Sequence, residues 1–445
     1  MITVIHGGTI VNEGKRFIGY IAYCDGVITE VGELPLPDKY KSQDCTLIDA
    51  SGCYVLPGVI DTHVHFRDGG NALSPKGNIT SESNAAMAGG VTSYFDMPNT
   101  VPQTVTLDAW RKKMEYAKIA SKVNYAFFLG AANDNIEELK RADYSSIPGI
   151  KLFMGASTGN MLVDDNDALD ELFRECRDRV IAVHAENQTI IEANKKRLIA
   201  RYGTENLPVT LHSAIRSREA CITSAQKAVS LAKKYNSRLH LLHISTADEL
   251  LLLTAGDVSD KRITAETCPH YLYFTEDDYS RLGARIKCNP AIKTATDRDA
   301  LIKAISDGRI DVIATDHAPH LLSDKQGNAF SAASGMPGVQ FSLPLMLELT
   351  HSHSELTIER VVELMSHNPA IIYSISRRGF LRKGNYADIV IVKEVSEYTL
   401  SDSDVKSLCG WTPYAGMTLH FKVVKTIVNG GCKAEAVRFR EGKIK

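Results

Sequence analysis

Long hydrophobic runs are absent from this sequence of 445 residues, and none is long enough to form a membrane-spanning helix. The first residues, 1–11, lack the basic segment and cleavage site of a secretory signal. We therefore expect a cytoplasmic chain with no membrane partner. An excess of either charge is also missing, since 51 Lys and Arg oppose 53 Asp and Glu, giving a net charge of −2. This balance does not favour nucleic acid as a partner, so we expect a small molecule.

Paired cysteines are missing as well. The nine cysteines are an odd number, lie scattered from Cys24 to Cys432 and include no CxxC pair. This pattern argues against a disulfide framework and against a thiolate zinc site. Any metal would need other ligands, so the 14 histidines are the residues to examine. The hydrophobic content of 44% is that of a globular chain, and the length predicts one large domain with an accessory.

Both ends of the chain have the pattern of β-structure. Short β-rich runs separated by turns occupy 2–11, 17–23, 27–31 and 46–48 near the start, and 387–392 and 419–428 near the end. Asp25 followed by Gly26 is a strong hairpin signal. Since neither end is long enough to form a domain alone, we predict a small sheet or β-sandwich domain built from both termini, residues 1–56 and 380–445.

The middle of the chain, residues 57–379, alternates apolar strands with amphipathic helices. The predicted strands are 59–66, 92–97, 124–129, 150–153, 180–184, 239–244, 263–266 and 312–315. The predicted helices include 107–121, 169–177, 216–235, 298–306, 341–349 and 358–365. Eight such units predict an α/β fold of the (β/α)8 TIM barrel type, with a doubly wound open sheet as the alternative.

Reactive side chains follow several of these strands. His63 and His65 stand two apart at the end of the first strand, where both imidazoles would point to one face. Lys151 lies in the fourth strand, where its amine would form a salt bridge or, once carbamylated, an anionic metal ligand. Taken alone, each of these residues has an ordinary structural explanation, such as a hydrogen-bonded core histidine or a rim salt bridge.

The coincidence of the set favours a site. The strand ends carry four histidines, one lysine and one aspartate: His63, His65, Lys151, His184, His243 and Asp316. A barrel gathers the C-terminal ends of its strands at one rim. Nitrogen and oxygen ligands suit zinc, and six exceed one tetrahedral site, so we expect two metal ions. A hydroxide bridging them would attack a carbonyl, with Asp316 placed to move the proton.

Longer motifs carry a resemblance to a known family. The segment 56–65, with Lys151, His184, His243 and Asp316 in order, resembles the cyclic amidase branch of the amidohydrolase superfamily. The segments 66–68, 97–100, 316–320 and 335–340 most resemble the class I dihydroorotases. The resemblance covers nearly the whole chain.

The resemblance implies a reaction and a set of roles. The reaction is the reversible cyclisation of N-carbamoyl-L-aspartate to L-dihydroorotate and water in pyrimidine synthesis. His63, His65 and Asp316 would hold one Zn²⁺, His184 and His243 the other, and carbamylated Lys151 with hydroxide would bridge them. Asp316 would pass a proton to the departing amide nitrogen. A homodimer is also an expectation from the family.

Substrate choice is predicted from charge. Dihydroorotate carries a carboxylate that plain hydantoins lack, and a guanidinium is its best single complement. Arg67 is that group, with Asn99 and His320 as further donors, while Asn289 would hold the ring. The competing explanations are a salt bridge from Arg67 to Asp68 and a turn role for Asn99.

Two other functions compete with dihydroorotase. An allantoinase or hydantoinase (dihydropyrimidinase) would use the same metals on another ring, and a non-catalytic relative would serve as a scaffold. The segment 155–160 after Lys151 is either a lid or an ordinary barrel loop. We expect His240 to point away from the site, unless a bulge reverses it. We expect four further histidines to be structural or on the surface: His212, His270, His351 and His353.

Overall fold

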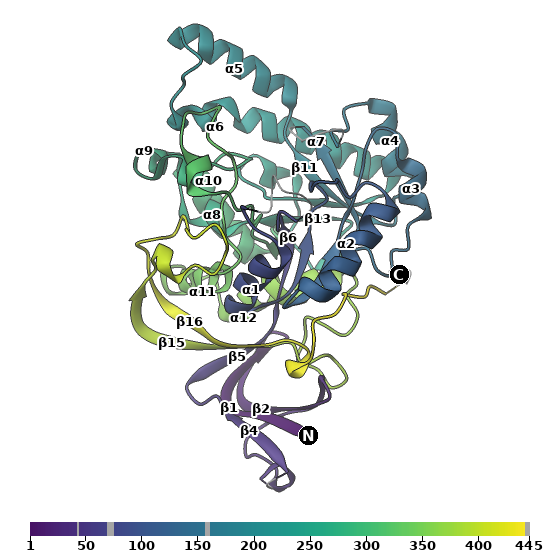
Figure 1. Cartoon of the computed structure of the whole chain (residues 1–445), viewed down its shortest axis with the longest axis vertical. Helices are drawn as coiled ribbons and strands as arrows, with labels where there is room; N and C mark the ends of the chain where they lie inside the picture. Colours follow the sequence, from purple (N-terminus) through teal and green to yellow (C-terminus); the bar gives the residue numbers. More distant parts are fainter. Residues whose placement is uncertain (42–43, 69–74, 156–160, 441–445) are drawn as a thin grey trace.

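The computed structural model describes residues 1–41, 44–68, 75–155 and 161–440. Its centre is a set of parallel strands (Figure 1). They are β6 (Val59–Val64), β7 (Val91–Asp96), β8 (Asn124–Phe127), β9 (Leu129–Gly130), β10 (Ile150–Met154), β11 (Val180–Ala185), β12 (Arg238–Leu241), β13 (Ile263–Thr267) and β14 (Val312–Ile313). β8 and β9 continue one another around Phe128 and correspond to the third predicted strand. Of the predicted segment 155–160, residues 156–160 lie outside the described residues.

Hydrogen bonds close the strands into a barrel. β6, β7 and β8 pair in parallel, and β9 to β14 form a second parallel series in chain order. The barrel closes between β6 and the segment that follows β14. There the His65 N–H donates to the His317 carbonyl at 2.7 Å, and the Thr315 hydroxyl donates to Asp61 Oδ2 at 2.6 Å. The strands are buried along almost their whole length, which explains their apolar sequence. The predicted (β/α)8 barrel is confirmed.

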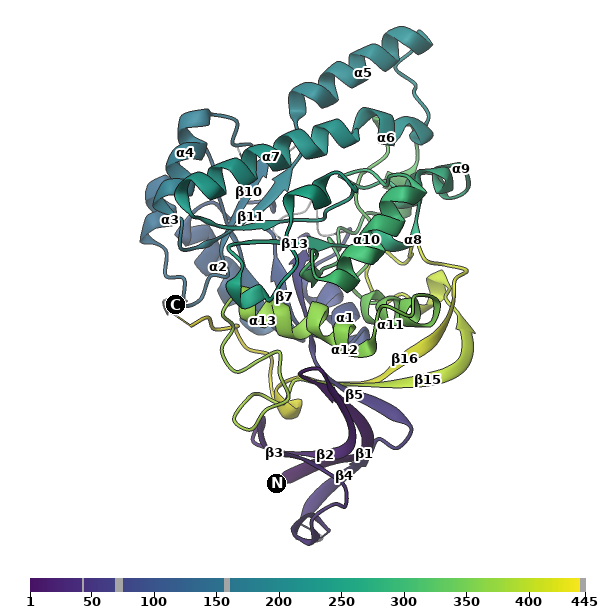
Figure 2. The ribbon, with the colours of Figure 1, turned by 180° about the vertical axis from the view of Figure 1, so that it is seen from behind.

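Helices cover the barrel (Figures 1 and 2). They are α1 (Ile79–Ala88), α2 (Leu107–Ala120), α3 (Ile136–Arg141), α4 (Asn166–Glu175), α5 (Gln188–Tyr202), α6 (His212–Ile215), α7 (Arg218–Tyr235), α8 (Pro269–Tyr273), α9 (Tyr279–Leu282), α10 (Ala295–Asp307), α11 (Ser342–Ser352), α12 (Ile358–Val362) and α13 (Asn368–Ile372), with a π-helical turn, Glu363–His367, between the last two. Side-chain oxygens of Asn78, Thr106, Ser217 and Thr294 cap α1, α2, α7 and α10. No described helix is long and apolar enough to cross a membrane.

The two ends of the chain share one seven-stranded sheet below the barrel in Figure 1. Its strands are β1 (Ile2–Asn12), β2 (Lys15–Cys24), β3 (Val27–Glu33), β4 (Cys45–Asp49), β5 (Cys53–Pro57), β15 (Ile389–Thr399) and β16 (Thr418–Ile427). The order is β16-β15-β5-β1-β2-β3, with β4 against β1, so the C-terminal strands join the N-terminal ones through β5. We refer to it as the terminal sheet. The domain boundaries at 56/57 and 379/380 stay a prediction.

The predicted turn at Asp25 and Gly26 joins β2 to β3. Both residues have positive φ, 49° and 80°, as a type I′ hairpin turn requires.

A buried polar network attaches the terminal sheet to the barrel. The guanidinium of Arg378 donates to Asp388, and both side chains are almost fully buried, at 2% and 4% exposed. Asp388 also accepts from the Asn429 N–H at 2.8 Å and from the amide of Asn124 on β8. Arg378 and Asp388 therefore connect the barrel strand β8 to the segment before β15 and to the segment after β16.

Candidate active site

One cavity collects the side chains predicted for the site. Its volume is about 480 Å³, and it opens at the C-terminal ends of the barrel strands. All ten predicted residues line it: His63, His65, Arg67, Asn99, Lys151, His184, His243, Asn289, Asp316 and His320. Phe153, Gln188, Arg216, Ala318, Ser334 and Gly335 complete the lining. The barrel thus brings together residues that lie up to 257 positions apart in the chain, from His63 to His320.

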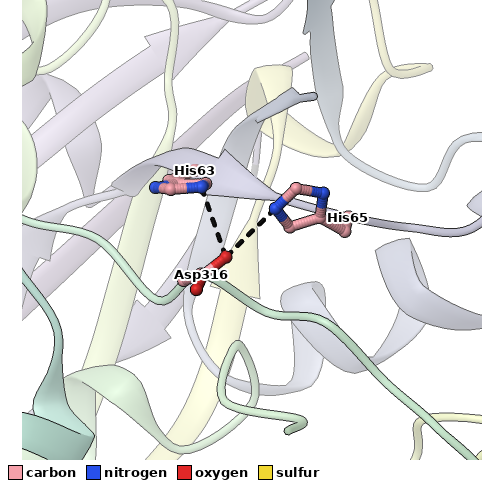
Figure 3. Close-up of side chains that lie close together, drawn as sticks. All are labelled: His63, His65 and Asp316. Carbon is pink, nitrogen blue, oxygen red and sulfur yellow. Dashed lines mark ion pairs between the residues drawn. The ribbon is translucent and has the colours of Figure 1, made fainter. Parts of the chain in front are cut away.

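Three of these residues converge on a single point (Figure 3). Asp316 Oδ1 lies 3.2 Å from His63 Nε2 and 3.0 Å from His65 Nε2. Both imidazoles extend from the end of β6, and Asp316 follows β14. The three ligand atoms lie within 4.8 Å of one another, which is a separation that one metal ion can bridge.

Acceptors on the outer side fix how these imidazoles are oriented. His63 Nδ1 lies 2.5 Å from Glu266 Oε1, and His65 Nδ1 lies 2.7 Å from Asn99 Oδ1. Since each outer nitrogen faces an acceptor, it carries the proton, and the inner Nε2 of each ring offers a lone pair. Two lone pairs and a carboxylate oxygen then face one another, and this arrangement suits a cation between them.

A second pair of histidines lies across the cavity. His184 Nδ1 and His243 Nε2 are 2.8 Å apart, and His184 Nε2 lies 3.1 Å from Glu186 Oε2. Glu186 also accepts from Arg216, so its charge is compensated. The two facing nitrogens form a second point at which a divalent ion would be held by imidazoles.

Left-handed backbone conformations direct three of the site residues. Arg67, His243 and Asp316 have φ values of 65°, 39° and 47°, a region that residues with a Cβ seldom occupy. Each such conformation costs of order 1–3 kcal/mol and is kept only where the surrounding structure enforces it. These residues follow β6, β12 and β14, so the strain lies where the strands end and the cavity begins.

Lys151 is the buried cation of the site. Its side chain is among the largest fully buried ones, and its Nζ lies 4.4 Å from the ring centroid of Phe153. No ion pair or hydrogen bond joins its amine to another described residue. Burial lowers the pKa of Lys151 to about 7, against the opposing effect of Asp316 and Glu266.

Burial favours the neutral, metal-binding form of three of the imidazoles. Burial lowers the pKa of His65 to about 4 and lowers the pKa of His184 and of His243. Burial alone would raise the pKa of Asp316, but the neighbouring His63, His65 and His243 keep it well below the usual range. At neutral pH the site therefore offers neutral nitrogens and a carboxylate, the donor set that zinc prefers.

Arg67 lies at the cavity without a carboxylate partner among the described residues. Its Nε donates to the Pro319 carbonyl at 3.2 Å, and one terminal nitrogen lies 3.0 Å from His320 Nε2. Asp68 instead accepts from the Ile79 N–H, so the salt bridge considered from the sequence does not form.

Asn289 is held by His212, whose Nε2 lies 3.2 Å from Asn289 Oδ1, so His212 supports the cavity wall.

For His240 the structure favours the alternative of a reversed direction. His240 does not point away from the site, because its Nε2 lies 3.3 Å from Glu266 Oε2, and Glu266 in turn contacts His63. β12 ends at Leu241, and the positive φ of His243 reverses the alternation that a continuous strand would impose.

Among the residues of the site that were not predicted from the sequence are Glu266, Gln188 and Arg216. Glu266 carried a usable signal, since it ends the predicted strand 263–266 as the ligand residues end theirs. Gln188 and Arg216 have no such signal in the sequence, because they lie in the long connection between β11 and β12 and not directly after a strand.

Comparisons with known proteins show which family the chain belongs to. The model of the amidohydrolase family matches residues 54–432. A dihydroorotase of Halobacterium salinarum is 35% identical over 86% of this chain and 87% of its own length. An allantoinase of Rubrobacter xylanophilus is 31% identical over 99% of this chain and 95% of its own length.

A solved structure is similar over almost the whole chain. It is an L-hydantoinase (dihydropyrimidinase) from Arthrobacter aurescens, with a TM-score of 0.88 and 30% identity, covering 98% of this chain and 96% of that one. These relatives have three different names at nearly equal identity, so the choice among ring substrates depends on the residues of the cavity.

Proposed function

The chain belongs to the amidohydrolase family, and we propose that this cyclic amide hydrolase is a dihydroorotase, which interconverts N-carbamoyl-L-aspartate and L-dihydroorotate. The observation that carries the proposal is the guanidinium of Arg67. It faces the cavity without a carboxylate partner among the described residues, whereas the second arginine of the cavity, Arg216, is paired with Glu186. Dihydroorotate supplies the missing carboxylate.

A charged substrate explains the cost of burying Arg67. Its partial burial lowers the pKa of this guanidinium, because the charged form loses part of its solvation. A bound carboxylate would restore the lost interactions through charge-assisted hydrogen bonds. His320, next to Arg67, and Asn99, on His65, would complete the carboxylate pocket, and Asn289 would hold the ring from the opposite connection.

The residues fit two divalent ions. We propose that His63, His65 and Asp316 hold one Zn²⁺, that His184 and His243 hold the other, and that carbamylated Lys151 lies between them. Bound there, the ions would polarise the ring carbonyl and supply an activated water at neutral pH. The buried amine of Lys151 has no ion pair or hydrogen bond among the described residues, and a carbamate would give it anionic oxygens to bind the two ions.

Asp316 is the residue that moves the proton. Its carboxylate lies at the floor of the cavity, oriented by the strained backbone after β14 and by Oδ1 contacts to His63 and His65. In the hydrolytic direction it would take a proton from the attacking water and deliver it to the departing amide nitrogen. The outer contacts from Glu266 and Asn99 keep the imidazoles, and hence this carboxylate, in place.

A comparison of three substrates tests the proposal. Purified protein is assayed with L-dihydroorotate, allantoin and 5-substituted hydantoins, with Asp316→Asn as the control that assigns activity to this cavity. We expect kcat/KM for dihydroorotate to exceed the other values by roughly 30- to 100-fold, the effect of one charged contact worth about 2–3 kcal/mol. A preference for allantoin or a hydantoin would make the chain a cyclic amidase of another specificity.

Metal analysis separates an enzyme from a scaffold relative. The proposal expects at least two zinc ions bound to each chain. Fewer than one tightly bound zinc per chain, together with no hydrolysis of any of these rings, would support the scaffold instead.

A further inference from the structure

A second group of metal-binding side chains lies outside the cavity, where the barrel meets the terminal sheet. It consists of Glu348 and His351 on α11 and His420 on β16, and none of the three lines the active-site cavity. We call it the peripheral cluster. Figure 2 shows α11 beside β15 and β16, so the cluster joins a barrel helix to the sheet built from the chain ends.

The ligand atoms of the peripheral cluster converge as in the active site. Glu348 Oε1 lies 2.8 Å from His420 Nδ1 and 3.6 Å from His351 Nδ1, and all three ligand atoms lie within 4.8 Å of one another. Two ligands bound tetrahedrally to zinc at 2.0–2.1 Å are about 3.3 Å apart. The observed distances lie on either side of this value, so small side-chain shifts would admit an ion.

Neighbouring contacts hold the ligands in this orientation. The His420 N–H donates to Glu348 Oε2 at 2.7 Å, which leaves Oε1 directed at the imidazoles. His351 Nε2 lies 3.4 Å from Glu394 Oε1 on β15, and its ring packs 4.8 Å from that of the buried Phe421. A carboxylate behind a ligating imidazole is the usual outer support of a histidine–metal bond.

Spacing and exposure indicate the kind of ion. Glu348 and His351 are three residues apart on one helix, so both face the same side, and the strand supplies the third ligand. His351 and His420 are 39% and 36% exposed, so an ion can enter from solvent and water can fill a fourth position. Two imidazoles and one carboxylate suit Zn²⁺ or a similar transition ion rather than Ca²⁺ or Mg²⁺.

We propose that Glu348, His351 and His420 form a second, non-catalytic zinc site that fastens helix α11 of the barrel to strand β16 of the terminal sheet. The ion would bind only when both elements are in place, so it would stabilise their contact.

Counting zinc in matched variants tests the site. Wild type, His351→Gln, His420→Gln, Glu348→Gln and the control His353→Gln are equilibrated in the same zinc buffer and analysed by mass spectrometry for metal per chain. His353 lies just beyond α11 and outside the cluster, so its variant controls for loss of any histidine near this surface. We expect the three cluster variants to contain one zinc fewer than wild type and His353→Gln, with unchanged hydrolytic activity.

Heat denaturation gives an independent readout. Zinc added to protein whose active site is already loaded should raise the Tm of wild type and His353→Gln by about 2 °C and leave the Tm of His420→Gln unchanged. Equal zinc content in all variants, or an equal rise in Tm, would overturn the site and leave the cluster as an ion pair. Neither result depends on which ring the enzyme hydrolyses, because activity is recorded separately.

Discussion

Arg67 combines partial burial, positive φ and the absence of an acidic partner among the described residues. The surrounding structure must hold the residue in this strained conformation. An anionic ligand would give the guanidinium the charge-assisted hydrogen bonds that it lacks. The residue that we propose to select the substrate is therefore also one of the costly residues of the native state.

Replacing Arg67 tests this role. For Arg67→Ala we expect kcat/KM with dihydroorotate to fall by roughly 30- to 100-fold, since a hydrogen bond to a charged group contributes about 2–3 kcal/mol. Steady-state kinetics measures the loss. Arg309→Ala, which removes an arginine paired with Asp307 outside the cavity, should keep the wild-type value. An unchanged kcat/KM in Arg67→Ala would remove Arg67 from the carboxylate pocket.

Lys151 gives a second test at a single residue. If its carbamate joins the two ions, Lys151→Ala should lose bound zinc and activity, and added short carboxylic acids should restore part of both by occupying the vacated space. Metal analysis and hydrolysis rates, each with and without propionate, measure the rescue. Full activity without any added acid would show that the carbamate is unnecessary.

At the scale of elements, site residues at the ends of strands could be predicted from the sequence, whereas those in the long connections could not. A strand covered on both faces is apolar along its length, and the first polar residues after it lie at the rim, which is why His63, His184 and Asp316 stood out in the sequence. The course of a long connection depends instead on tertiary packing, so Gln188 and Arg216 reach the cavity without a local signal.

The direction of individual side chains could not be predicted from the sequence either. A regular strand would place His240 and His243 on opposite faces, and the reversal depends on one left-handed residue that no composition rule identifies. The same conformation at Asp316 and Arg67 shows that the site is built where regular strand geometry stops.

The capping of α1 offers a prediction about an element. Asn78 accepts from the Ser81 N–H at 2.9 Å and begins the helix that carries Glu82, whose carboxylate contacts His317 beside Asp316 at 2.8 Å. Asn78→Ala should lower the free energy of unfolding by about 1 kcal/mol, the usual cost of a lost N-cap. Urea denaturation measures it, with the exposed Asn84→Ala of the same helix as a control. Equal stability of both variants would contradict the cap's contribution.

At the scale of the molecule, burial distinguishes two ion pairs that both involve the segment before β15. Arg378 and Asp388 are 2% and 4% exposed, whereas Arg382 and Glu13 are 54% and 39% exposed. Asp388→Ala leaves the buried guanidinium of Arg378 with only the amide of Asn429 and the more distant carboxylate of Glu435, 3.8 Å away, as polar partners among the described residues, and should lower the free energy of unfolding by about 3 kcal/mol. Arg382→Ala should cost at most about 1 kcal/mol, because water screens the exposed pair.

Chemical denaturation of these two variants, followed by circular dichroism, measures the difference. Comparable losses for the buried and the exposed pair would mean that the polar network around Asp388 does not hold the terminal sheet to the barrel. The homodimer expected from the family stays a prediction at this scale.

The pairing of β5 with β15 has a consequence for synthesis on the ribosome. β5 ends at Pro57 and β15 begins at Ile389, so β5 has no β15 to pair with while the residues of the barrel are being synthesised. At 5–20 residues per second that wait lasts roughly 20–60 s. During this time the edge of β5 is open to pairing with other nascent chains. The barrel can close before its sheet is complete, and a ribosome that stalls late would release a chain with a finished cavity and an unfinished sheet.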